Sequence, residues 1–160
     1  MVELVVVLVL LGTLAAIGGQ QFFNLQSYRQ RAWTDQLTIT ASYARAQAIA
    51  NRSQKVRLVL DVSRLRADLA ADCSTSSATA LVNPAGNADL SVTAPGGVTL
   101  AVVGQSLPFT VCFDSQGRPR DTSSANGSLL TSVTTLQVMA GGSTPTNTVY
   151  LEPQTGFIHP

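Results

Sequence analysis

The first residues of this chain form an apolar run that contains one carboxylate. Within residues 1–17 the only charged side chain is Glu3, and the next charged residue is Arg29. A charge in a membrane-length apolar segment is unfavourable by roughly 2.5 to 3.5 kcal/mol at the centre of the segment, and by less near its end. Such an acid indicates a function that requires a partner group, which we expect on another chain.

Two other interpretations of the apolar run stay open. One is a secretory signal cleaved near Leu14-Ala15-Ala16, although such signals begin with a basic region and this run begins with an acid. The other is a simple transmembrane anchor, because the run is near the lower limit for crossing about 30 Å of hydrocarbon.

A helical pattern continues beyond the apolar run and ends near Asn51. Apolar and small residues recur at steps of three and four, the period of an amphipathic helix, and we expect the larger ones to face a sheet. Arg45 and Arg52 would favour the negative end of this helix. A helix of this length would extend about 75 Å, so lipid or neighbouring subunits must bury its N-terminal half. The recurring residues are Phe22, Leu25, Arg29, Trp33, Leu37, Ala41, Ala44 and Ala48, of which Arg29 is the charged exception.

Strand patterns follow the helix and predict an α+β fold in which a long N-terminal helix packs on an antiparallel sheet. Residues 1–28 would form the hydrophobic helix, and residues 29–160 a globular domain. Residues 63–97 are rich in turn formers and are predicted to be largely irregular, with 65–69 as a short extra element at most. Gly117 and Gly156 are expected to adopt positive φ in turns. Strands are predicted at 55–62, 98–103, 109–114, 129–139 and 148–152.

Charge and cysteine content narrow the range of functions. The net charge is +1 and charged residues make up 12% of the chain, so no strong field attracts nucleic acid or an anionic surface. Cys73 and Cys112 are an even number in a chain whose apolar start implies export. We therefore expect a disulfide, with two buried free thiols as the alternative.

Catalytic and metal-binding patterns are sparse. The single histidine is His159, so a histidine-based triad or metal cluster has almost no support, and no nucleophile and base can be paired. We expect no enzyme activity, no metal and no cofactor. Asp68 with Asp72, or Asp114 with Asp121, could hold calcium, but we expect these to be solvated loop carboxylates.

The opening sequence Met-Val-Glu-Leu-Val-Val-Val-Leu-Val-Leu-Leu-Gly-Thr-Leu-Ala-Ala-Ile resembles the start of mature type IV pilins and pseudopilins. Members of that family begin Phe-Thr-(Leu or Met)-(Ile or Val)-Glu-Leu. The resemblance implies a type IV pilin fold, and a Phe-Thr pair with a short basic leader ahead of Met1. It also implies that Glu3 neutralises the N-terminal amine of a neighbouring subunit during assembly.

The same resemblance implies a weak stretch in the helix. In pilins, the segment between a mid-anchor glycine and a proline often loses helical structure inside the filament. Gly12 lies where that glycine belongs, whereas Gln20 replaces the proline. We expect the Gly18-Gly19 pair to supply the weakness instead, because each glycine lowers helix stability by roughly 1 kcal/mol relative to alanine.

The family implies partners and a location. The partners would be other pilin or pseudopilin subunits. Before assembly the subunit would lie in the inner membrane, with its globular domain in the periplasm. After assembly it would belong to an extracellular or periplasmic filament. A pilus and a type II secretion pseudopilus, and a major and a minor subunit, stay open. The Ser/Thr-rich segment 74–91 could be an adhesive surface or simple decoration.

Shorter motifs resemble particular classes within the family. Phe113-Asp-Ser-Gln-Gly-Arg118 and Thr155-Gly-Phe-Ile158 resemble paired strand ends of H-type pseudopilins and FimT-like minor pilins. Segments within residues 22–50 also resemble the minor pilins of mannose-sensitive haemagglutinin pili. These resemblances extend over the first 50 residues and over scattered motifs of the globular part.

The FimT-like resemblance raises DNA binding as an alternative function. Pilins of that kind have a Gly-Arg-x-Arg arrangement near the C-terminal end, where this chain has Gly156-Phe-Ile-His159 with neither arginine. A similar tetrapeptide, Gly117-Arg-Pro-Arg120, occurs at the preceding turn. Arg118 and Arg120 could contact phosphates, although a solvated hairpin tip is the commoner meaning of such a motif.

Overall fold

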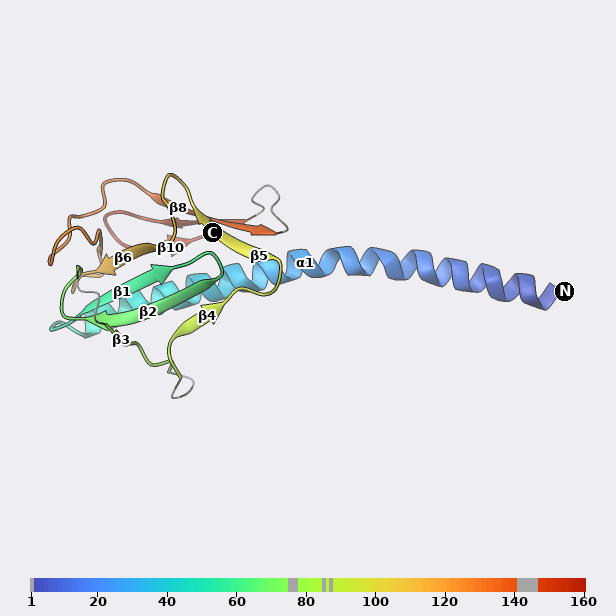
Figure 1. Ribbon diagram of the computed structural model, residues 1–160, viewed down its shortest axis with the longest axis horizontal. Coiled ribbons are helices and arrows are strands. Elements are labelled where there is room, and N and C mark those ends of the chain that lie inside the picture. The colour runs from blue at the N-terminus through green and yellow to red at the C-terminus, as the bar shows by residue number, and fades with distance from the viewer. Residues whose placement is uncertain (1, 75–77, 85, 87, 141–146) are drawn as a thin grey trace.

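One long helix and two antiparallel sheets make up the fold. The computed structural model describes residues 2–74, 78–84, 86, 88–140 and 147–160, without the side chains of Val2 and residues 14–26. Helix α1 runs from Val2 to Ala50 without interruption. Its second half lies along the sheets, while its first half projects away from them (Figure 1). At 1.5 Å per residue the helix is about 73 Å long.

The two sheets contain all ten strands of the described chain. The first sheet has the order β3-β2-β1-β6-β7, with β4 also paired to β2, and the second has the order β10-β9-β8-β5. All strand pairs are antiparallel. The first sheet consists of β1 (Lys55–Leu60), β2 (Arg64–Ala70), β3 (Thr79–Ala80), β4 (Ser91–Thr93), β6 (Phe109–Phe113) and β7 (Pro119–Arg120). The second consists of β5 (Val98–Val102), β8 (Thr134–Ala140), β9 (Asn147–Leu151) and β10 (Ile158–His159).

The α+β prediction is confirmed, and the short element predicted at 65–69 is present as part of β2. The prediction missed the short strands β3 and β4, which also lie within residues 63–97. In β2 the apolar Leu65 and Ala67 point into the core, between charged neighbours. The predicted strand at 129–139 begins only at Thr134, because Leu129 and Leu130 pair instead with β7.

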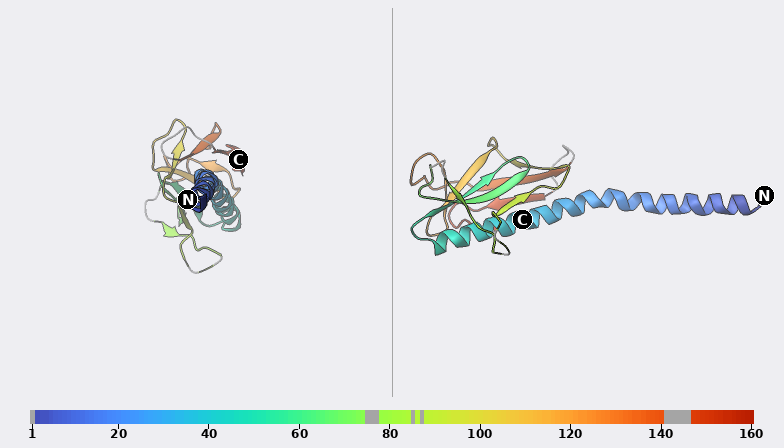
Figure 2. Two further views of the ribbon diagram at one scale, coloured as in Figure 1. Left: turned by 90° about the vertical axis from the view of Figure 1, so that its right-hand side faces the viewer. Right: turned by 60° about the horizontal axis from the view of Figure 1, so that its bottom comes forward.

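The core lies between one face of α1 and both sheets. Trp33, Leu37, Ala41, Ala44 and Ala48 are at most 1% exposed, as the period predicted. The alanines let the sheets approach the helix closely. The opposite face of the helix is not covered: Ser42 and Ala46 are exposed, and Figure 2 shows the strands gathered on one side of α1. The sheet residues of the core include Val56, Leu58, Leu60, Leu65, Val111, Phe113, Leu100, Leu136, Val138, Val149, Leu151 and Ile158.

Candidate assembly surface

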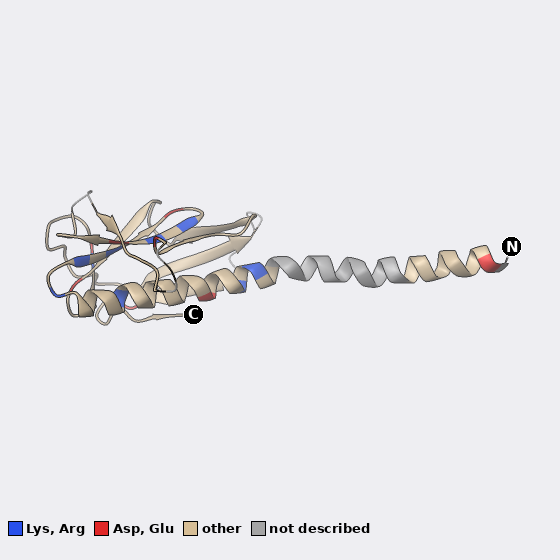
Figure 3. Cartoon of the chain, turned by 90° about the horizontal axis from the view of Figure 1, so that it is seen from below, with Lys and Arg blue, Asp and Glu red and all other residues tan. Residues whose placement is uncertain are grey.

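The projecting part of α1 exposes a continuous apolar surface. The eight consecutive side chains from Leu4 to Leu11 are each 50 to 68% exposed. Glu3 lies beside them in the first turn of α1. Figure 3 shows the Lys and Arg positions only on the globular part and the adjoining half of the helix. Contiguous apolar surface of this kind marks a site that lipid or protein covers. Among the described residues, no helical stretch is both long and apolar enough to cross a membrane.

The outward face of the second half of α1 extends this pattern. Tyr28 and Ile39 are 68% and 67% exposed, and Ile49 is 44% exposed. Asp35 is an exposed acid on the same helix, and no ion pair to it is present among the described residues. The sheets therefore leave one side of the helix open along its length.

Only one of the three glycines predicted to weaken the helix lies among the residues that the structure describes in full. Gly12 lies within continuous helix, and a Cβ added there would meet no atom within 4 Å. The predictions for Gly18 and Gly19 fall in the stretch 14–26, outside the residues described in full. Loss of helical structure inside a filament stays a prediction at all three positions.

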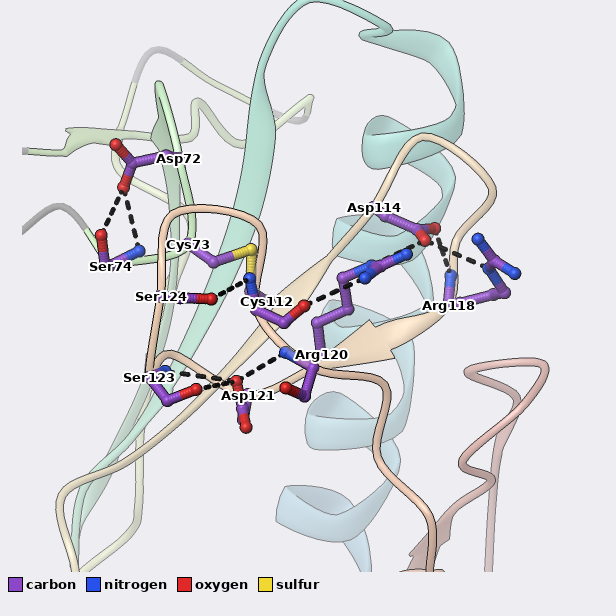
Figure 4. The surroundings of a disulfide bond; sticks show 12 residues. Asp72, Cys73, Ser74, Cys112, Asp114, Arg118, Arg120, Asp121, Ser123 and Ser124 are labelled. Atoms are coloured by element: carbon purple, nitrogen blue, oxygen red, sulfur yellow. Dashed lines mark hydrogen bonds and ion pairs between the residues drawn. A yellow bond between two sulfur atoms is a disulfide. The ribbon is translucent and has the colours of Figure 1, made fainter.

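The predicted disulfide between Cys73 and Cys112 is present. Their Cα atoms are 5.5 Å apart, and both residues are fully buried. Cys112 lies in β6, while Cys73 follows β2, and the backbone N–H of Cys73 donates to the carbonyl of Ala125. The bond therefore joins the segment after β2 to strand β6, and the hydrogen bond of Cys73 links the same segment to the loop 121–127 (Figure 4).

Asp114 forms the centre of a charged cluster beside this disulfide. Its Oδ2 accepts hydrogen bonds from Nε of Arg118 at 3.1 Å and from Nε of Arg120 at 2.9 Å. Its Oδ1 accepts the backbone N–H groups of Gln116 and Arg118, both at 2.9 Å. Burial alone would raise the pKa of Asp114, but these hydrogen bonds together lower the pKa below its ordinary value.

The structure corrects the expectations for two of the acidic residues and for the two arginines of the Gly117 turn. Asp114 is not a solvated loop carboxylate, since it is only 3% exposed, and neither is Asp68, which lies in β2 at 6% exposure with Arg66 at 3.3 Å. Arg118 and Arg120 are not free cations at a solvated hairpin tip, because both bind Asp114. Their contact with DNA stays a prediction. No group of three or more potential metal ligands occurs among the described residues.

Arg45 has a contact that the sequence did not indicate. It was expected to favour the helix end, but its Nε donates to the carbonyl of Gly117 at 3.3 Å and to that of Thr155 at 2.8 Å. These carbonyls belong to two turns that each contain a positive-φ glycine, Gly117 at 73° and Gly156 at 65°. One arginine therefore joins α1 to turns from both sheets. The paired motifs around Gly117 and Gly156 were the only signal that these turns meet.

Comparison with solved structures finds proteins of the same fold, whereas the sequence comparisons find none. No protein-family model and no curated protein matches the sequence. Two solved structures of the minor pseudopilin EpsH from the type II secretion system of Vibrio cholerae match the fold. One matches with a TM-score of 0.57 and 14% identity, over 84% of this chain and 94% of the other. The second matches over the same shares, with a TM-score of 0.50 and 16% identity. The chain therefore has a pilin-like α+β fold, in which a long N-terminal helix packs on antiparallel sheets as in that pseudopilin.

Proposed function

We propose that this chain is a structural subunit, a minor pilin or pseudopilin, of a type IV pilus or a type II secretion pseudopilus. The observation that supports this most strongly is the projecting apolar helix, with eight exposed side chains from Leu4 to Leu11. A globular part that covers only the second half of α1 leaves the first half to be covered by other molecules. The pilin-like fold is consistent with such a role. The proposal involves no catalysis and no cofactor.

Assembly in this proposal is side-by-side packing of apolar helices. Before assembly, lipid of the inner membrane covers the projecting segment, and the globular domain lies in the periplasm. During assembly, the equivalent helices of neighbouring pilin or pseudopilin subunits replace the lipid. The outward side chains Tyr28, Ile39 and Ile49 would continue this contact along the globular half. A major pilin would share these features and is the alternative within the same class.

Glu3 gives the packing its specificity. It is the only acid among the described residues of the projecting segment. In an apolar surrounding, an unpaired carboxylate is unfavourable by several kcal/mol, and an opposite charge within contact distance offsets much of this penalty. We propose that the partner is the N-terminal amine of a neighbouring subunit. A helix that enters the filament at another level would leave both charges without partners.

The test is incorporation of Glu3→Ala and Glu3→Gln subunits into filaments in the producing cell. Sheared filaments are compared with whole cells by immunoblot, and fluorescence of the single tryptophan, Trp33, reports whether the globular part is folded. We expect both variants to fold and their incorporation to fall about tenfold or more, the effect of losing a few kcal/mol of pairing.

Asp89→Asn is the control, because Asp89 is an exposed acid between β3 and β4 and does not lie on the outward face of α1. Its incorporation should stay at the wild-type level. Wild-type incorporation of Glu3→Ala subunits would show that the assigned role of Glu3 is wrong.

A further inference from the structure

A cleft beside the Asp114 cluster has apolar walls and one cation. Its volume is about 490 Å³. It lies between the segment that leads to β8 and the turn that follows β9. Leu129 is 42% exposed there, so part of the apolar wall faces solvent. The lining residues are Arg118, Leu129, Leu130, Thr131, Pro153 and Gln154.

Arg118, which lines this cleft, has an unused hydrogen-bonding edge. Its Nε donates to Asp114, and its backbone N–H donates to the same carboxylate. The two terminal nitrogens have no hydrogen-bond partner among the described residues, and in Figure 4 only Nε of the guanidinium is joined to the carboxylate. A guanidinium held in this way presents its terminal nitrogens as a fixed pair of donors. Such a pair matches the two oxygens of a carboxylate.

The charges around the cleft do not balance. Asp114 is one negative charge shared by Arg118 and Arg120, so the cluster has an excess of one positive charge. Arg45 adds a further positive charge at the neighbouring Gly117 turn. Two further acids adjoin these residues in sequence. Asp121 accepts hydrogen bonds from Ser123 and Ser128, and Glu152, next to the lining residue Pro153, has its Oε1 3.2 Å from Nε2 of His159. The complement of this surface is therefore an anion.

We propose that the cleft binds a carboxylate side chain flanked by aliphatic residues, presented by an acidic segment of a neighbouring subunit. The carboxylate would meet the terminal nitrogens of Arg118, and the aliphatic neighbours would pack on Leu129, Leu130 and Pro153. A nucleic acid is the weaker candidate. Nucleic acids need several phosphate contacts for affinity, and this cleft offers one open guanidinium between apolar walls. That the partner is a filament subunit rests on the proposed function, whereas the chemistry of the cleft does not.

The test is a peptide titration of the isotope-labelled full chain in detergent micelles, followed by NMR. The probes are acetyl-Leu-Glu-Leu-amide and acetyl-Leu-Gln-Leu-amide, which differ only in the charge of the central side chain. We expect saturable shifts of the Arg118 Nε–H signal and of the Leu129 and Leu130 methyl signals with the glutamate peptide. The glutamine peptide should bind at least about tenfold more weakly than the glutamate peptide, as expected for loss of a charge-assisted hydrogen bond.

Variants locate the effect at Arg118. Arg118→Gln should weaken binding of the glutamate peptide about tenfold, and Arg118→Lys should weaken it less, because lysine keeps the charge but loses the paired donors. Arg52→Gln is the control, since Arg52 is exposed and has no ion pair among the described residues. Its binding should equal that of the wild type. If Arg118→Gln fails to fold, the two peptides on the wild-type chain still decide the question.

Three results would overturn the proposal: equal binding of the two peptides, unchanged binding by folded Arg118→Gln, or shifts at Arg118 with a short thymidine oligonucleotide but with neither peptide. The titration needs no filament. Its failure would therefore leave the Glu3 result unaffected, and failure of the Glu3 experiment would leave the cleft's chemistry standing.

Discussion

The backbone of Gly156 lies directly against the carbonyl oxygen of Gly117, so that a Cβ added at Gly156 would collide with that oxygen. Gly156 also has a φ of 65°, a conformation that is unfavourable for other residues. The contact brings a turn of the second sheet against a turn of the first, beside the end of α1. Both properties of Gly156 make glycine necessary there.

Gly156→Ala should therefore lower the free energy of unfolding by more than the cost of holding an alanine at positive φ. Gly104→Ala separates the two effects, because Gly104 has a φ of 74° but open space around it. We expect a loss of about 1 to 2 kcal/mol for Gly104→Ala, and clearly more for Gly156→Ala. Denaturant unfolding of the full chain in detergent, followed by Trp33 fluorescence, measures both. Equal losses would show that the two turns are less tightly packed than the structure indicates.

Removal of the disulfide should destabilise the globular part without unfolding α1. The two cysteines are 39 residues apart in sequence. In the chain-entropy description, a loop of that length contributes about 4 kcal/mol. The Cys73→Ala/Cys112→Ala double variant is compared with wild-type protein in denaturant unfolding. A loss of less than about 1 kcal/mol would mean that β6 and the segment after β2 stay together without the bond.

Asp114→Asn should remove a pH-dependent part of the stability. The pKa of Asp114 is lowered from 3.8, so its carboxylate stabilises the fold above that pH, and this contribution is lost as the pH falls further. At neutral pH we expect the variant to be less stable by about 2 kcal/mol, the scale of a hydrogen bond to a charged group. The difference between the variant and the wild type should shrink in unfolding measurements below pH 3.8. A difference that is constant with pH would contradict the charged role of Asp114.

Two alanines in the same turn of α1 allow a matched test of how closely the sheets approach the helix. Ala44 is fully buried, whereas Ala46 is exposed on the open side of the helix. Ala44→Leu should destabilise the fold by about 1 to 3 kcal/mol, because the added atoms have no space in the packed core. Ala46→Leu should change stability by about 0.5 kcal/mol or less. Similar losses for the two variants would contradict the orientation of the helix.

The helix and its buried face could be predicted from the sequence because the period is regular over many turns. Strand β2 was indicated only as a short element at 65–69, and β3 and β4 not at all, because turn-forming residues dominate the composition around them. The Asp114 cluster and the Arg45 contacts depend on how the turns meet. Arg45 lies 72 residues from Gly117 and 110 from Thr155, so no local pattern joins them. The disulfide could be predicted because a chain with two cysteines allows only one pairing.

The helix joins the sheets through side chains spread along several turns, from Trp33 to Ala48, and through Arg45 at the far end. A pulling force applied to the projecting end of α1 would act parallel to the interface between the helix and the sheets, so all of these contacts would resist it together. A molecule built in this way is suited to transmit mechanical tension from one end to the other.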